Sequence, residues 1–147
     1  MNFLMKMIIR WPKKISPGKV SQRLVANYDI LPTFIDITGY KGTVNTDGLS
    51  FYQDLIGKGA ALEHEYVVFS SFLGPALITK DGWKLRSYLT KDVFELYYLP
   101  DDYREEHDLS KQNYEKLKEL KIKLLEACDG DYNNGLYTHQ KNQIDVE

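Results

Sequence analysis

The clearest periodicity in the chain lies between residues 113 and 128, where apolar side chains recur every three or four residues. This spacing predicts an amphipathic helix with one buried stripe and one charged face. The apolar positions are Tyr114, Leu117, Leu120, Leu124, Leu125 and Cys128, and the charged ones include Glu115, Lys116, Lys118, Lys123 and Glu126. The stripe needs another surface to cover it.

Four short segments before this helix cluster or alternate apolar residues in the way that strands do. They are residues 66–69, 76–79, 83–89 and 93–98. Asp81-Gly82 is a hairpin signal, and residues 83–89 alternate large apolar with polar side chains, as in a strand with one face on a core. The segments predict a four-stranded antiparallel sheet, and the helix at 113–128 is the element expected to cover it.

The first forty residues predict a strand, a loop and a helix. Residues 7–9 form a short apolar run that Trp11-Pro12 ends, because proline cannot donate to a ladder. Asp29 stands where it would cap a helix, and Gly39 stands where a left-handed residue would end it. The apolar residues of this helix are Ile30, Leu31, Phe34, Ile35 and Ile37. Their broad face predicts a well-buried helix.

Composition places the chain among ordinary globular proteins. With 147 residues, 43% hydrophobic and 27% charged, it is long enough for one domain with its own core. Its single cysteine, Cys128, cannot form an internal disulfide and is expected to be a small core residue of the last helix.

Charge is distributed unevenly, because residues 1–28 carry six lysines and arginines and no acid, although the formal net charge is −2. These cations are spread without interleaved aromatic residues, so nucleic acid is not expected as a partner. The segment before Pro12 is too short, and too interrupted by Lys6 and Arg10, for a signal peptide or a membrane span. No membrane association is predicted, and the localisation stays unknown.

A series of motifs in this order and spacing resembles the sulfatase family of the alkaline-phosphatase-like superfamily. The matching residues are Met7, Ile8, Ile9, Trp11, Pro12, Pro17, Gly18, Asp29, Pro32, Thr33 and Gly39, then Asp47-Gly48-Leu49-Ser50, Gly82-Trp83-Lys84-Leu85, Glu95-Leu96-Tyr97 and Asp108-Leu109. No single motif is specific, but the series covers nearly the whole chain.

The resemblance implies an α/β fold class, or α+β for the chain in isolation, in three parts. Residues 1–60 would be the last strand and helices of a sulfatase core, including a short helix after Ser50. Residues 61–130 would form a C-terminal four-stranded antiparallel sheet packed by a helix. Residues 131–147 have no period and few aliphatic side chains, so we expect a loose tail.

The chemistry that the resemblance implies lies outside these residues. Sulfatases use a formylglycine, made from a Cys or Ser in a C-x-P-S/A-R run, and a calcium ion held by several Asp and Asn. Cys128 is followed by Asp129-Gly130-Asp131, so it lacks that context. In relatives the catalytic lysine precedes the strand that begins here at Met7. We therefore expect no catalytic or metal-binding residue, no cofactor in this chain, and no activity of the chain alone.

The match begins abruptly at Met7, after Leu4-Met5-Lys6 in place of the Arg-x-Pro of relatives. This favours a C-terminal fragment, from a truncated reading frame or an internal start. An isolated chain would expose the apolar surface of residues 7–9 and 29–39, so we expect self-association through it.

Three residues are candidates for substrate binding: Trp83, Lys84 and His64. An aromatic ring beside a cation suits stacking on a sugar and pairing with its anionic groups, and the parent sulfatase would act on a sulfated carbohydrate or an aryl sulfate. The structural interpretation is favoured for all three, with Trp83 anchoring the core of the sheet and Lys84 on the surface.

Two other functions stay open at this point. The chain could be a carbohydrate-binding or interaction module that uses the sheet around Trp83. It could equally be the corresponding fragment of a phosphodiester or phosphonate hydrolase of the same superfamily, because these residues alone do not distinguish sulfate from phosphate.

Overall fold

A computed structural model of the chain describes residues 7–59 and 62–135. The chain divides into two compact units, the N-terminal unit Met1–Glu65 and the C-terminal unit Tyr66–Glu147. Each unit is described by itself below.

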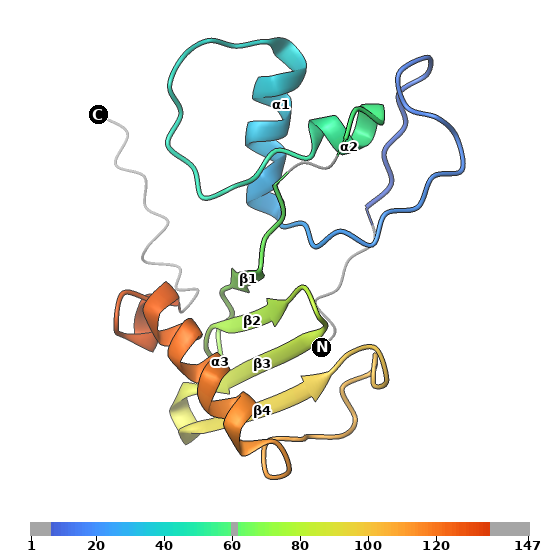
Figure 1. Ribbon diagram of the computed structural model, residues 1–147. Helices are drawn as coiled ribbons and strands as arrows, with labels where there is room; N and C mark the ends of the chain where they lie inside the picture. The colour runs from blue at the N-terminus through green and yellow to red at the C-terminus, as the bar shows by residue number, and fades with distance from the viewer. Residues whose placement is uncertain (1–6, 60–61, 136–147) are drawn as a thin grey trace. The chain divides into compact units, whose positions relative to one another are not determined.

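The C-terminal unit is built on a four-stranded antiparallel sheet in the order β1-β2-β3-β4, as the sequence predicts (Figure 1). The strands are β1 (Tyr66–Phe69), β2 (Ala76–Thr79), β3 (Trp83–Tyr88) and β4 (Val93–Tyr98). Leu85 of β3 lies opposite Leu77 of β2 and Leu96 of β4, so three leucines form one row across the sheet. The third strand ends one residue before its predicted end, because Leu89–Lys91 form the short 3-10 helix η2.

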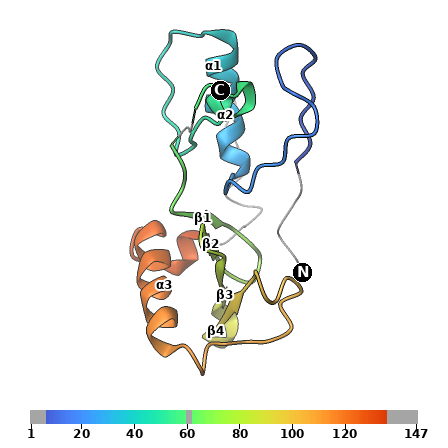
Figure 2. The same cartoon turned by 45° about the vertical axis from the view of Figure 1, so that its right-hand side comes forward.

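Helix α3 (Tyr114–Ala127) covers one face of this sheet, as the periodicity predicts (Figure 2). Leu120 and Leu124 of α3 are fully buried and join the leucine row and Cys128 in one core cluster. After α3 the chain forms the 3-10 helix η3 (Tyr132–Gly135), and Tyr132 packs against the core cluster. The first residues of the expected loose tail are therefore held in place, and residues 136–147 lie outside the described part of the chain.

The segment that links β4 to α3 runs along the outer edge of β4, the last strand of the sheet. The backbone N–H of Leu109 donates to the Leu96 carbonyl at 2.7 Å, and the Asp108 carboxylate accepts from the Leu96 N–H at 3.0 Å. These bonds satisfy backbone groups on the outer edge of β4, which would otherwise be free to pair with another strand. They also explain the Glu95-Leu96-Tyr97 and Asp108-Leu109 motifs as structural.

The N-terminal unit contains the 3-10 helix η1 (Asn27–Asp29), helix α1 (Ile30–Thr38) and the short helix α2 (Tyr52–Ile56). Helix α1 ends at Gly39, which is left-handed with φ of 66°. Asp29 occupies the N-cap position of α1, as predicted, but its side chain makes no capping bond, because η1 already precedes the helix and the carboxylate binds other groups. The predicted strand at residues 7–9 is also wrong, because no strand of the described residues pairs with it.

The apolar face of α1 is largely exposed in this chain, contrary to the well-buried helix predicted from its sequence. Leu31 is 51% and Phe34 is 58% exposed, and Ile8 before the helix is 94% exposed. The exposed apolar surface expected of the chain in isolation is therefore present. Self-association through it stays a prediction.

Candidate functional site

Trp83 and Lys84, the two candidates on β3, point to opposite faces of the sheet, because successive strand residues alternate. Trp83 shares its face with Leu85 and packs against the core beneath α3. Lys84 lies on the face away from α3. His64 belongs to the N-terminal unit. The structure therefore does not bring Trp83 and Lys84 together into one binding surface.

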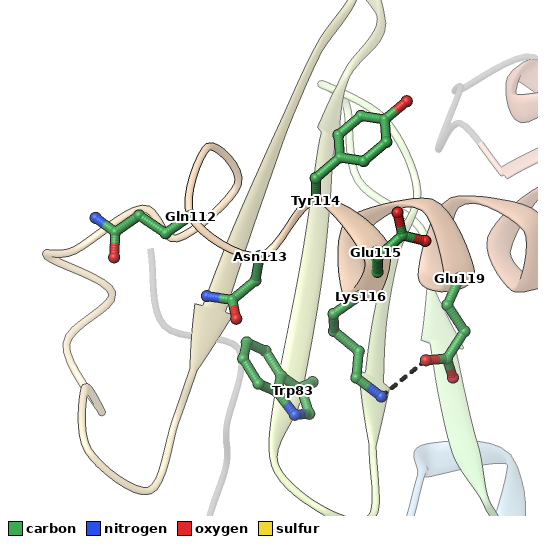
Figure 3. Close-up of a pocket in the computed structure, with 7 residues that line it drawn as sticks. All are labelled: Trp83, Gln112, Asn113, Tyr114, Glu115, Lys116 and Glu119. Carbon is green, nitrogen blue, oxygen red and sulfur yellow. Dashed lines mark hydrogen bonds and ion pairs between the residues drawn. The ribbon is translucent and has the colours of Figure 1, made fainter.

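Trp83 lines a shallow hollow of about 610 Å³ at the start of α3 (Figure 3). Its ring lies 4.9 Å from that of Tyr98, centroid to centroid, which holds it in place. The Lys116 ammonium stands 6.0 Å from the Trp83 ring and donates to Glu119 at 2.8 Å. Asn113 lies above the ring in Figure 3, whereas Tyr114 points away.

The charges around this hollow do not favour an anion. Lys116 is the one lysine among the seven lining residues, and Glu115 and Glu119 are both acidic. A half-buried indole with neighbouring amide groups suits stacking on an uncharged sugar ring, but a sulfate group would meet net negative charge. The hollow therefore favours the polyol part of a ligand over its anionic part.

Lys84 is fully buried, so the expectation of a surface lysine is wrong. Its Nζ donates to Glu105 Oε1 at 2.6 Å, and the Glu105 side chain is only 4% exposed. Burial lowers the pKa of Lys84 from its usual value, and the hydrogen bond and charge of Glu105 oppose that shift. Lys84 is thus occupied by an internal partner and is not positioned to contact a ligand.

Lys84 and Glu105 belong to a charged cluster, which we define as Lys84, Arg86, Glu95, Tyr97 and Glu105. The Arg86 guanidinium donates to Glu95 from two nitrogens, one of them Nε at 3.0 Å, and reaches Glu105 Oε2 at 3.4 Å. The Tyr97 hydroxyl donates to Glu95 at 2.8 Å. Burial, followed by the bond to Glu95, raises the pKa of Tyr97. Both cations face a carboxylate, which makes this cluster a structural network and not a reactive one.

Sequence reasoning missed this cluster, although part of its signal was present. Lys84 and Arg86 are two residues apart on β3, so their side chains lie on the same face of the sheet. The strand register places Arg86 opposite Glu95 of β4. If the register of β3 and β4 had been predicted from the sequence, it would have indicated this ion pair between neighbouring strands. Glu105 gives no such signal, because it lies in a connection whose path is not periodic.

His64 closes a second polar cluster around the buried carboxylate of Asp29. Its Nε2 lies 2.7 Å from Asp29 Oδ1, which also accepts from the Leu49 N–H at 2.7 Å. Asp29 Oδ2 accepts from the Ala26 N–H at 2.7 Å. Asp29 therefore joins three separated segments of the N-terminal unit, and His64 is one of the groups that it holds.

Thr33, the other polar residue of the D-x-x-P-T motif, is also structural. Its hydroxyl donates to the Asp29 carbonyl at 2.7 Å and accepts from the Phe51 N–H at 3.1 Å. Helix α1 is thereby joined to the segment that leads into α2. The polar residues of this motif thus bind backbone groups and, at Asp29, the His64 ring.

Neither the calcium ion nor the formylglycine that sulfatases use has a fitting site among the described residues. Across residues 7–59 and 62–135, no group of three or more His, Cys, Asp or Glu side chains is arranged to hold a metal ion. Cys128 is 3% exposed, and burial raises the pKa of its thiol.

Within the same described residues, no helix has the length and apolar character needed to cross a membrane.

Comparison with known proteins gives consistent matches. The family of N-sulphoglucosamine sulphohydrolase C-terminal regions matches residues 1–129. An ulvan-active sulfatase of Formosa agariphila is 30% identical in an alignment that covers 79% of this chain and 31% of that protein. An N-acetylglucosamine-6-O-sulfatase of Bacteroides thetaiotaomicron is 29% identical, over 87% of this chain and 25% of that protein.

A solved structure shows the same fold. It is that of a protein in complex with its substrate, D-glucosamine-2-N,6-O-disulfate, and it superimposes with a TM-score of 0.69 at 27% identity, over 86% of this chain and 28% of that one. The chain thus spans 31% and 25% of the length of the two curated relatives. The predicted sheet and packing helix are those of this shared fold.

Proposed function

Because this chain belongs to the family of N-sulphoglucosamine sulphohydrolase C-terminal regions, we propose that it serves as the C-terminal part of a sulfatase that acts on sulfated carbohydrates. The observation that carries the proposal is the family match over residues 1–129, which includes both the N-terminal unit and the helix-on-sheet unit. Both curated relatives are named as sulfatases, which supports sulfate over phosphate as the group removed.

In this proposal the chain supplies structure and surface to the enzyme, and other sequence supplies the reacting groups. The polar residues of its motifs bind backbone or one another, as Asp29, Thr33 and Asp108 do. A formylglycine and a calcium ion in the catalytic core of the complete enzyme would provide the nucleophile and offset charge on the sulfuryl group. The sequence has no C-x-P-S/A-R run, and the part of the chain that the structure describes offers no group of three or more metal-ligating side chains.

The purified chain is expected to show no hydrolysis of an aryl sulfate in the presence of calcium. Loss of the nucleophile and of the metal each removes several kcal/mol of barrier reduction, and one charge-stabilising group alone is typically worth ~10²–10³ in rate. The measurement is fluorescence release from 4-methylumbelliferyl sulfate, with a heat-treated sample as the blank. Turnover above the blank that is abolished by EDTA and restored by calcium would contradict the proposal.

A second candidate function, a carbohydrate-binding module, is favoured by one observation, the half-buried Trp83 ring at the rim of the hollow beside α3. A stacking sugar would change the fluorescence of this ring. The Trp11→Phe variant leaves Trp83 as the single tryptophan of the chain.

Under the main proposal, titrating a sulfated disaccharide into the Trp11→Phe variant is expected to leave its fluorescence unchanged, since Glu115 and Glu119 oppose an anion at the Trp83 hollow. A saturable change that disappears in the Trp11→Phe, Asn113→Ala variant would favour the binding-module function instead. Lys118→Ala, an exposed change on α3 away from the hollow, is the matched control.

A further inference from the structure

The N-terminal unit contains a hollow of about 310 Å³ formed by residues 9–13 and 15–19, which we call the basic hollow. Arg10, Lys13 and Lys19 line it, and none of its ten lining residues is an aspartate or a glutamate. Trp11 and Ser16 also line it, so an aromatic side chain and a hydroxyl stand among the cations. This is the opposite charge balance to that of the Trp83 hollow.

The cations of the basic hollow lack carboxylate partners among the described residues. No hydrogen bond or ion pair joins the side chain of Arg10 or Lys13 to any other part of residues 7–59 and 62–135, whereas Arg23 of the same unit binds Asp54. The third cation, Lys19, has its Nζ close to Gly57 at the C-terminal end of α2. In a chain with 21 acidic residues, two unpaired cations on one concave surface leave a local positive potential.

The backbone fixes this arrangement. The Trp11 carbonyl accepts from the N–H groups of Lys14 at 3.1 Å and Ile15 at 2.9 Å, which closes a tight turn after Pro12. Lys13 takes φ of 69° within this turn, a left-handed conformation that favours glycine or asparagine. The turn therefore holds a lysine, at some conformational cost, on the same concave surface as Arg10.

We propose that the basic hollow binds the anionic ester group of a sulfated saccharide, with Arg10 and Lys13 pairing with the sulfate and Trp11 contacting the sugar. The proposal rests on the proposed function and deepens it, because it assigns a saccharide contact to this chain. A tetrahedral monoester anion fits the donor set, since a guanidinium and an ammonium both donate to its oxygens. The same chemistry would accept a phosphate ester, so the test must distinguish the two sources.

The test uses the full chain with Trp83→Phe, which leaves Trp11 as the single tryptophan to report binding by its fluorescence. Glucosamine 6-sulfate, glucosamine 6-phosphate and unmodified glucosamine are titrated in parallel at low salt. Arg10→Gln combined with Lys13→Asn removes both cations, and asparagine tolerates the left-handed turn. Lys91→Gln combined with Lys118→Gln removes the same charge from exposed positions of the C-terminal unit and is the matched control.

Saturable binding of the sulfate ester is expected, weakened about tenfold or more by the Arg10 and Lys13 changes, because one lost charge-assisted contact already amounts to roughly that factor. The control pair should retain the affinity of the parent protein, and unmodified glucosamine should not bind. Tighter binding of the phosphate ester would contradict the proposal that the ligand of the basic hollow is a sulfate ester. Three results would contradict the proposed site. They are no binding, equal weakening by the Arg10/Lys13 pair and the Lys91/Lys118 control pair, and equal affinity for a short DNA of matched charge.

These outcomes are separable from failure of the proposed function. The basic hollow is tested by binding alone, and the proposed function by the expected absence of calcium-dependent turnover by the purified chain. Arg10 and Lys13 are exposed, so their replacement should leave the far-ultraviolet circular dichroism spectrum and thermal unfolding of the chain unchanged. A folded variant that no longer binds is therefore informative about the hollow itself.

Discussion

Replacing Glu105 with alanine is expected to lower the free energy of unfolding of the C-terminal unit by about 3–5 kcal/mol, the range for removing one partner of a buried ion pair. Lys84 is fully buried, and its ammonium would lose the Glu105 carboxylate to which it donates. Glu105 has φ of 59°, and alanine shares the same left-handed strain, so the backbone contributes little to the difference.

The pH dependence of the stability loss in Glu105→Ala shows whether Lys84 causes that loss. The folded pKa of Lys84 already lies below its usual 10.5 because of burial, and loss of Glu105 lowers it further. Between that lowered value and 10.5 the unfolded chain binds more protons than the folded one, so stability rises with pH in this window. The Glu105→Ala variant should therefore regain part of its stability as the pH approaches 10.5.

Urea unfolding followed by circular dichroism measures both effects. The double variant Lys84→Met, Glu105→Leu should return to within about 2 kcal/mol of the parent, because an apolar pair of similar size removes the uncompensated charge. Lys123→Ala, which breaks an exposed pair with Glu119, is the control and should cost less than about 1 kcal/mol. A Glu105→Ala loss as small as that control would mean that Lys84 is solvated in the folded protein.

The parts of the fold that the sequence predicted are those with a local period. The leucines of α3 recur at helical spacing, and residues 83–88 alternate, so each element signals both its type and its buried face. Asp81-Gly82 then joins β2 and β3 with little choice of register. Helix-on-sheet packing follows, because both elements have one apolar side to cover.

The predictions that failed depend on contacts between distant residues. Residues 7–9 have the composition of a strand, but a strand exists only where a neighbour accepts its backbone bonds, and none of the described residues does. Lys84 looked like a surface residue because nothing in residues 83–89 reveals that Glu105 folds over them. Asp29 has the position of a helix cap, yet its carboxylate is taken by Leu49 and His64, which lie 20 and 35 residues away.

The candidate site shows the same division. The sequence made Trp83 a candidate for stacking on a sugar, but the acidic neighbours that make its surroundings unsuited to sulfate, Glu115 and Glu119, come from α3. The basic hollow, in contrast, is local to residues 9–19. Its charge was visible in the sequence as a run without acids, and the concave turn that gathers the charges required the structure.

Replacing Leu85 with alanine is expected to lower the free energy of unfolding of the C-terminal unit by about 2–5 kcal/mol. Leu85 is fully buried at the centre of the leucine row, between Leu77 and Leu96 and within the cluster that α3 covers. Truncation removes apolar contact and leaves a cavity that three strands and a helix cannot all close.

Urea unfolding of Leu85→Ala in the Trp11→Phe background measures this loss, because Trp83 then reports on the C-terminal unit alone. Ile122→Ala is the matched control: Ile122 is 50% exposed on α3, so its truncation should cost less than about 1 kcal/mol. Equal effects of the two changes would mean that α3 does not cover the sheet in solution. A large loss at Leu85 with an unchanged Trp11 signal, read in Trp83→Phe, would show that the sheet and helix unfold as a unit of their own.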